Sequence, residues 1–157
     1  MSDTKLRIPK ATSLLKEDHQ AVKKLFRQYK SLKESQESEK QSIVDQIREL
    51  LQVHSKIEEE IFYPAVARLD DSKAGVQVRE AEEEHRLVKT LLDDLSALAP
   101  GGETFEAKMI LLMESVLHHA EMEESDLFQL FGRLERAERD RVSEQLLSRK
   151  RELSGEA

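Results

Sequence analysis

The sequence IRELLQVHSKIEEEIFYPA, residues 47–65, decides the fold. In an α-helix, side chains three or four positions apart line one face. On this segment that face carries apolar side chains interrupted by one imidazole and one carboxylate: Ile47, Leu51, His54, Glu58, Ile61 (or Phe62) and Ala65. An apolar face packs into a core, where His54 and Glu58 are costly to bury unless something inside the protein binds them. The segment therefore predicts a core helix with a polar site in its middle.

Three further segments repeat this pattern, each with one histidine inside an apolar stripe. The stripes are Leu15, His19, Val22, Phe26 and Tyr29; Val78, Ala81, His85, Val88, Leu92 and Leu95; and Leu112, Val116, His119, Glu123 and Leu130. His119 is followed four residues later by Glu123, as His54 is by Glu58. Two of the four stripes therefore offer a histidine and a glutamate on the same helix face.

The composition predicts an all-α protein, because the chain has only five Gly and three Pro and lacks alternating strand patterns. Turn signals divide it into helices at about 11–34, 38–69, 72–98 and 103–131, with a charged fifth helix at about 134–153. Pro64 should kink the second helix near its end. Short connections favour an up-down-up-down antiparallel four-helix bundle with an additional C-terminal helix. We expect an N-terminal arm (1–10), the bundle (11–131) and a C-terminal charged helix and tail (132–157).

The spacing of the four histidines predicts that they lie at one level of this bundle. In an antiparallel hairpin, two residues share a level when the turn lies midway between them. The position midway between His19 and His54 falls within 35–38, and that between His54 and His85 falls at 69–70. The position midway between His85 and His119 is Gly102. All three positions are turns, so the imidazoles should lie within about 5 Å of one level along the bundle.

Four neutral imidazoles and two inward carboxylates suit a dinuclear metal site in which each glutamate bridges both ions. The chain has no cysteine, so the ligands must be nitrogen and oxygen atoms. Such a mixture suits iron, and to a lesser degree manganese or zinc. Six protein ligands leave coordination positions open for a small ligand such as O₂, peroxide or NO.

His19, the segment His54-Ser-Lys-Ile-Glu58, His85, and the segment His119-Ala-Glu-Met-Glu123 resemble the hemerythrin family, and more narrowly the bacterial HHE cation-binding domains. The resemblance covers about residues 11–131. It implies an oxo- or hydroxo-bridged non-heme di-iron centre. It also implies that His19 and His54 ligate one iron, that His85 and His119 ligate the other, and that Glu58 and Glu123 bridge them.

One position departs from the oxygen-carrying members of that family. Those proteins have a further histidine one turn before the third-helix histidine, where this chain has Ala81. Glu82 could substitute as a seventh ligand. A more carboxylate-rich site would favour reaction with O₂ or peroxide over reversible O₂ storage. We interpret His118 as a solvated neighbour of His119, and Glu59, Glu60, Glu83, Glu84 and Glu124 as a solvated face.

Charge and hydropathy narrow the possible partners. The net charge of −7 disfavours nucleic acid and anionic membrane, because both favour a basic face. No apolar run approaches the roughly 20 residues that span a bilayer, and residues 1–10 lack the apolar core of a signal peptide. We therefore expect a cytoplasmic protein, and the sequence indicates no particular protein partner.

Three functions remain open from the sequence. The first is a stand-alone di-iron protein that binds or reacts with O₂, peroxide or NO, in oxidative or nitrosative stress. The second is an iron or oxygen sensor, or an iron-binding module, that acts through a partner without catalysis. The third is a structural bundle whose polar core only fixes the register of its helices.

Overall fold

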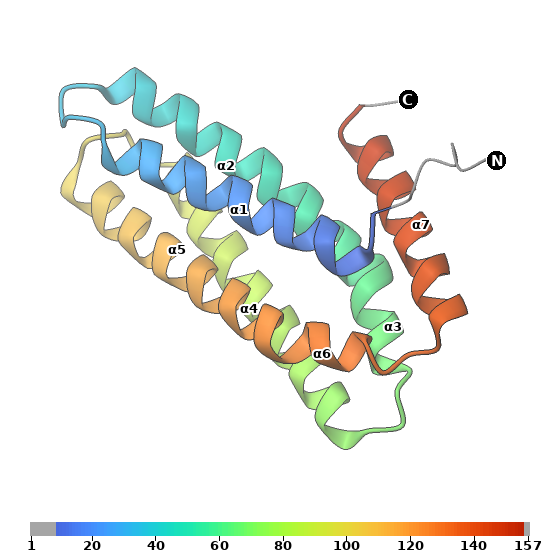
Figure 1. Ribbon diagram of the computed structural model, residues 1–157. Coiled ribbons are helices and arrows are strands. Elements are labelled where there is room, and N and C mark those ends of the chain that lie inside the picture. The colour runs from blue at the N-terminus through green and yellow to red at the C-terminus, as the bar shows by residue number, and fades with distance from the viewer. Residues whose placement is uncertain (1–8, 156–157) are drawn as a thin grey trace.

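The computed structural model describes residues 9–155, and within that range every regular element is a helix (Figure 1). The elements are α1 (Ala11–Lys30), α2 (Glu37–Ile57), the π-helical segment η1 (Glu58–Phe62), α3 (Tyr63–Ala67), α4 (Ser72–Ser96), α5 (Glu103–Met122), the π-helical segment η2 (Glu123–Leu127), α6 (Phe128–Phe131) and α7 (Arg136–Leu153). Residues 1–8 of the expected N-terminal arm, and 156–157 of the expected tail, lie outside the described residues.

Four antiparallel rods form the bundle: α1; α2 with η1 and α3; α4; and α5 with η2 and α6 (Figure 1). The helix α1 packs mainly against α2, and α4 packs mainly against α5. The all-α, up-down-up-down fold and its additional C-terminal helix are therefore confirmed. None of the described helices is both long and apolar enough to cross a lipid bilayer.

Local hydrogen bonds set the helix ends. The first helix ends at Lys30, four residues earlier than predicted, because polar side chains bind the backbone there. The Ser31 hydroxyl donates to the Gln28 carbonyl at 2.7 Å, and the Lys33 N–H donates to the Gln36 side chain at 2.8 Å. At the start of α4, the Asp71 carboxylate accepts from the Lys73 N–H at 2.8 Å, which is an N-cap.

The second rod bends near its end, where the sequence predicts a kink at Pro64, but its hydrogen-bond pattern already changes before the proline (Figure 1). The helix α2 changes into a π-helical turn at Glu58, and Pro64 lies in the first turn of the short helix α3 that follows. Figure 1 shows the chain changing direction between α2 and α3. Proline has no N–H, but in the first turn of a helix, here after a π turn, that N–H is not needed for an intrahelical hydrogen bond. Pro64 therefore does not end the rod, which continues to Ala67.

The four histidines divide the apolar core into two clusters, as expected for imidazoles that lie at one level along the bundle. Along each rod, the histidine separates residues of one cluster from residues of the other. On α1, Leu15 precedes His19 and belongs to one cluster, and Val22 follows His19 and belongs to the other. One cluster includes Leu15, Ile57, Phe62, Tyr63, Ala81, Leu127 and Phe131. The other includes Val22, Phe26, Ile47, Leu51, Val88, Met109, Leu112 and Val116. A polar layer one side chain thick therefore crosses the whole bundle between them.

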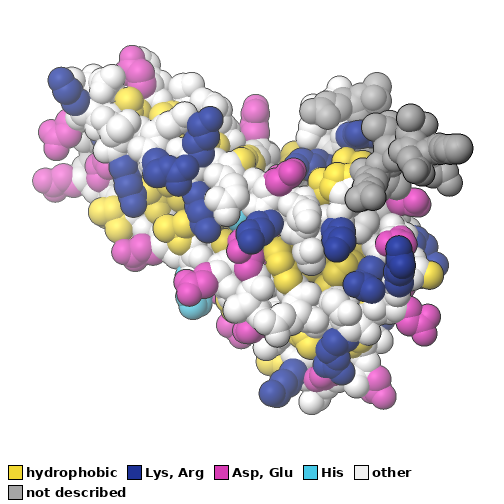
Figure 2. Space-filling model, viewed as in Figure 1, with side chains coloured by type: hydrophobic (Ala, Val, Ile, Leu, Met, Phe, Trp, Pro, Cys, Tyr) yellow, Lys and Arg dark blue, Asp and Glu magenta, His cyan; other side chains and the backbone are white. Residues whose placement is uncertain are grey.

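The C-terminal helix α7 packs against α1, α2 and η1. Its residues Val142 and Leu146 are buried in the cluster that contains Leu15. The Ser143 hydroxyl oxygen accepts the N–H of Ala11 at 2.8 Å, in a buried contact between the two ends of the chain. Figure 2 shows basic and acidic side chains interspersed over the face that carries α1 and α7. The last helix is thus an integral part of the folded unit.

Candidate metal centre

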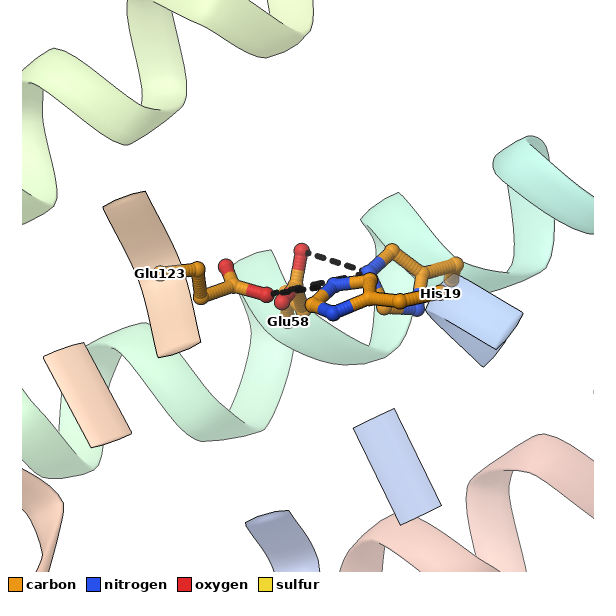
Figure 3. Close-up of side chains that lie close together, drawn as sticks. His19, Glu58 and Glu123 are labelled. Carbon is orange, nitrogen blue, oxygen red and sulfur yellow. Dashed lines mark ion pairs between the residues drawn. The ribbon is translucent and has the colours of Figure 1, made fainter. Parts of the chain in front are cut away.

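All six residues of the sequence-derived ligand set meet in the polar layer. Ligand atoms of His19, His54, Glu58 and Glu123 lie within 4.8 Å of one another, and so do those of Glu58, His85 and His119. Figure 3 shows the His19 ring directed toward the carboxylates of Glu58 and Glu123, which come from the two other rods. Each of the six residues is at most 9% exposed. Glu58 belongs to both groups, so the two groups share one carboxylate.

The imidazoles form two pairs. The rings of His19 and His54 have centroids 5.0 Å apart, and those of His85 and His119 are 4.8 Å apart. These are the pairs that the hemerythrin resemblance assigns to separate ions. Among the described residues, no other two of these four histidine rings form a close aromatic contact.

Both glutamates lie between the two imidazole pairs. Glu58 Oε1 is 3.2 Å from His54 Nε2 on one side and 3.1 Å from His85 Nε2 on the other. Glu123 Oε1 is 3.0 Å from His19 Nε2, and Glu123 Oε2 is 3.4 Å from His119 Nε2. Each carboxylate can therefore interact with both halves of the centre at once, as a bridging ligand does.

The two π-helical segments set where these glutamates point. Each begins at the glutamate of a His-x-x-x-Glu motif, at Glu58 and at Glu123. A π turn widens the helix and brings residues five positions apart onto one face, and such turns are frequent at functional sites. The residue five positions after Glu58 is Tyr63, and the residue five positions after Glu123 is Phe128. Phe128 stacks on the His19 ring with centroids 6.1 Å apart and planes 5° apart.

Tyr63 is the residue of the centre that the stripe pattern missed. Its hydroxyl oxygen lies 2.7 Å from Glu123 Oε2 and 3.1 Å from Glu58 Oε1, so its hydrogen can go to either carboxylate. The same oxygen is 3.1 Å from His85 Nε2 and 3.2 Å from His119 Nε2, from which it can accept. A pattern of three- and four-residue steps cannot place Tyr63 with Glu58. The repeated Glu-x-x-x-x-aromatic spacing was the available signal.

A ring of outer carboxylates orients the four imidazoles. His19 Nδ1 contacts Glu124 at 2.8 Å, His54 Nδ1 contacts Asp18 at 2.8 Å, His85 Nδ1 contacts Glu59 at 2.7 Å, and His119 Nδ1 contacts Glu84 at 2.8 Å. A carboxylate on Nδ1 fixes that nitrogen as the N–H and leaves Nε2 free to bind a metal. All four Nε2 atoms face the centre for this reason.

The sequence interpretation of Glu59, Glu84 and Glu124 as a solvated face is therefore incomplete: their side chains are 46%, 19% and 26% exposed, and each also contacts a histidine of the centre. The acids of the outer ring are each next in sequence to an inward ligand: Asp18 precedes His19, Glu59 follows Glu58, Glu84 precedes His85, and Glu124 follows Glu123. Each one reaches the histidine of the next rod, so the contacts pass once around the bundle. An acid beside an inward ligand points toward the neighbouring rod, and this spacing was the signal for the ring.

When no cation is bound, the electrostatics of the centre favour the protonated forms of His54 and His119 and the ionised form of Glu58. Burial opposes charge on His54, but Glu58, Asp18 and Glu123 outweigh it and raise the pKa of His54 to about 10. Burial likewise opposes charge on His119, but Glu123, Glu58 and Glu84 raise its pKa to about 12. Burial would raise the pKa of Glu58, yet His54 and the neighbouring hydrogen bonds hold it well below the ordinary range. Burial and the two carboxylates raise the pKa of Tyr63, which keeps its phenol neutral.

Among the described residues, four buried polar atoms of the centre form no hydrogen bond of good geometry, although His19 Nε2 lies 3.0 Å from Glu123 Oε1: His19 Nε2, His54 Nε2, Glu58 Oε2 and Glu123 Oε1. Buried polar groups are normally satisfied, and a set of unsatisfied ones needs an explanation. These atoms are two imidazole nitrogens and two carboxylate oxygens, and their four residues form one of the two groups whose ligand atoms lie within 4.8 Å of one another. The residues present therefore fit a metal cation.

The other candidate positions lie outside the two groups. The Glu82 side chain is 40% exposed and lies 3.9 Å from Arg79. The His118 side chain is 70% exposed and approaches only Glu84, at 3.8 Å, among the described ion pairs. Ala81 is fully buried in the core. The structure thus does not bring Glu82 to the ligand atoms, and His118 is the solvated neighbour that the sequence predicts.

A small cavity of about 20 Å³ touches all four histidines and is otherwise walled mainly by apolar side chains, among them Val22, Leu51, Val88, Val116 and Ala120. That volume accommodates about one water-sized molecule. A wider open groove of about 750 Å³ runs between α2 and α4. The groove and the small cavity share four lining residues, which are Leu51, Ser55, His85 and Val88. The groove therefore leads to the outer wall of the cavity.

Comparison with known proteins agrees with this geometry. The family model described as hemerythrin HHE cation binding domain matches residues 10–131. The solved structure of a hemerythrin HHE cation-binding domain-containing protein from Mycobacterium kansasii is similar, with a TM-score of 0.80 and 26% identity over 94% of this chain and 88% of that chain. A DNA nickase of Nostoc sp. (strain PCC 7120) is 30% identical over 116 residues, which are 73% of this chain. This chain spans only 31% of the length of that nickase.

Proposed function

Because this chain belongs to the family of hemerythrin HHE cation-binding domains, we propose that it holds two iron ions and binds or reacts with O₂, peroxide or NO. Metal binding by the buried His/Glu cluster follows from the family and from the geometry of the cluster. The choice of iron rests on the mixture of imidazole and carboxylate donors, with manganese and zinc as weaker fits. The observation that carries the proposal is the shared Glu58, which joins two separate ligand groups.

In this proposal His19 and His54 hold one ion, His85 and His119 hold the other, and Glu58 and Glu123 bridge them. The close ring pairs and the position of each glutamate between them support this division. When bound, two such ions supply open coordination positions and electrons for a small oxidising ligand. Glu82 as a seventh ligand has no support from its exposed position beside Arg79.

The protein's own residues prepare the site for a small ligand. The outer carboxylates hold the four imidazoles in one orientation with Nε2 toward the centre, so the rings do not need to turn when a metal binds. The Tyr63 phenol stays neutral, and its oxygen lies 2.7 Å from Glu123 Oε2, so its O–H can donate a hydrogen bond to a ligand in the centre. The cavity of about 20 Å³ holds about one water-sized molecule, which supports a diatomic molecule or peroxide over a larger substrate.

The apolar position Ala81 supports reaction over storage. It lies where oxygen-carrying family members have an extra histidine, and the buried alanine side chain offers no donor atom in place of that imidazole. We therefore favour turnover of O₂, peroxide or NO, in oxidative or nitrosative stress and in the cytoplasm, over reversible O₂ carriage.

Metal analysis of protein purified from iron-replete cells tests the proposal. We expect about two irons per chain, and optical spectra that change on adding O₂, hydrogen peroxide or NO. The double variant His54→Ala plus Glu58→Ala should lose iron, whereas His118→Ala, which changes the exposed histidine beside His119, should keep it. Wild-type protein without iron, or a double variant that retains both irons, contradicts the proposal.

The alternative is an iron or oxygen sensor, or an iron-binding module, that acts through a partner without catalysis. One observation favours it: the last helix contacts the outer ring, so metal occupancy and the docking of α7 can affect each other. A centre that binds iron but leaves peroxide and NO unchanged would favour this alternative. We do not extend DNA nicking to this chain, because it spans 31% of that protein and its net charge of −7 disfavours a DNA-binding face.

A further inference from the structure

The outer carboxylate ring is asymmetric. The Asp18 carboxylate contacts His54 Nδ1 through Oδ2 at 2.8 Å and Lys150 Nζ through Oδ1 at 2.8 Å. The other three outer acids, Glu59, Glu84 and Glu124, form no ion pair with a lysine or arginine among the described residues. Among the ligands that the structure describes, His54 is thus the one whose outer acid pairs with a lysine from α7.

Burial explains why Asp18 needs that cation. The Asp18 side chain is 9% exposed, against 46% for Glu59, 19% for Glu84 and 26% for Glu124. Solvent can stabilise the charge of the three more exposed acids, but it reaches Asp18 poorly. A buried carboxylate requires an ionic or hydrogen-bonding partner for each oxygen. Lys150 supplies the partner for the oxygen that His54 does not use.

Other contacts hold α7 in place independently of Lys150. Leu146 is fully buried, and the Ser143 hydroxyl accepts the Ala11 N–H. Arg68 pairs with Glu138 at 2.8 Å, and Arg149 pairs with Glu60 at 2.8 Å. The Lys150 ammonium is therefore not required merely to dock the helix, and its contact with Asp18 is free to serve the centre.

We propose that Lys150 is a positioning residue for the metal centre, which acts through Asp18 on the His54 ligand. Lys150 fixes the Asp18 carboxylate so that Oδ2 stays on His54 Nδ1, and this keeps Nε2 directed at the ion. The half of the centre formed by His19 and His54 then depends on α7, and the half formed by His85 and His119 does not. This inference rests on the proposed function in one respect, since it takes His54 as a ligand.

Titration of the metal-free, full-length protein with Co²⁺ tests this assignment, using the visible Co²⁺ absorption and competition with a chelator. Wild-type protein should bind two Co²⁺ ions. Lys150→Met should weaken one of the two by roughly tenfold, at the lower end of the effect of outer-shell changes, and should alter its absorption bands. Lys150→Arg should restore both. Arg68→Gln, which removes the α7 ion pair with Glu138, should leave both affinities unchanged.

Asp18→Asn shows whether Lys150 acts through Asp18. This variant should weaken the same ion, and adding Lys150→Met to it should cause no further loss, because the two changes interrupt one connection. The double variant removes both charges together, so it still decides the question if Lys150→Met alone does not fold. Wild-type affinity for both ions in Lys150→Met, or fully additive losses in the double variant, overturns the inference. Wild-type protein that binds no Co²⁺ overturns the proposed function, and this inference with it.

Discussion

At the scale of residues, the centre is built from an inner set of six ligands and an outer ring of four acids. The inner set follows from the helical stripes, because a buried His or Glu on an apolar face is conspicuous. The outer ring does not follow from the stripes, because Glu59 or Glu84 lies beside the apolar face and looks like any surface acid. The position of each acid next to an inward ligand indicates the ring, but its distance to the histidine of the neighbouring rod comes from the packed structure.

Tyr63 should stabilise the metal-free centre through its contacts with two buried carboxylates. Tyr63→Phe leaves Glu123 Oε2 without its 2.7 Å donor, so we expect a loss of about 1–3 kcal/mol in the free energy of unfolding of metal-free protein. Tyr29→Phe is the matched control, since the hydroxyl of Tyr29 donates to the more exposed Glu106 at 2.9 Å. Urea unfolding measures both, and equal losses would refute the special role of Tyr63.

At the scale of elements, the helix number, order and approximate bounds could be predicted from the sequence. The first helix ends four residues early because Ser31 and Gln36 bind backbone groups, which a stripe pattern does not reveal. The π-helical turns could not be predicted from steps of three and four, since those steps assume an α-helix throughout. The docking of α7 also could not be predicted from the stripes, because only a few of its residues are apolar and it packs against α1, α2 and η1, which are distant in sequence.

The helix α7 should unfold together with the bundle. Leu146→Ala removes a fully buried side chain from the core cluster that contains Leu15, so we expect a loss of about 2–5 kcal/mol in the free energy of unfolding. Leu147→Ala changes the neighbouring, partly buried leucine and should cost clearly less. Guanidinium unfolding should show one transition for both variants. A separate early transition that removes only part of the helical signal would mean that α7 is an independent segment.

At the scale of the whole molecule, a polar layer separates two apolar clusters, and the charge state of that layer should govern stability. The folded-state pKa of His54 is raised from 6.5 to about 10, so its stabilising contribution is complete below pH 6.5 and is lost as the pH rises through about 10. The pKa of Glu58 is depressed below 4.5, so its contribution is present above pH 4.5 and is lost on further acidification. Metal-free protein should therefore be most stable between about pH 4.5 and 6.5.

Thermal unfolding as a function of pH measures this dependence. The Tm of metal-free protein should fall steadily between pH 6.5 and 10. Metal binding requires neutral imidazoles and releases their protons, so the metal-loaded protein should keep its Tm over the same range. A metal-free Tm that does not change between pH 6.5 and 10 would contradict the ionic description of the layer.

The central claim is that two ions lie in this layer, one for each imidazole pair, with Glu58 and Glu123 between them. Anomalous diffraction at the iron absorption edge, from crystals of protein purified from iron-replete cells, tests it most directly. The account predicts two anomalous peaks, one in contact with His19 and His54 and the other in contact with His85 and His119. A single peak, or no peak within the polar layer, would contradict it.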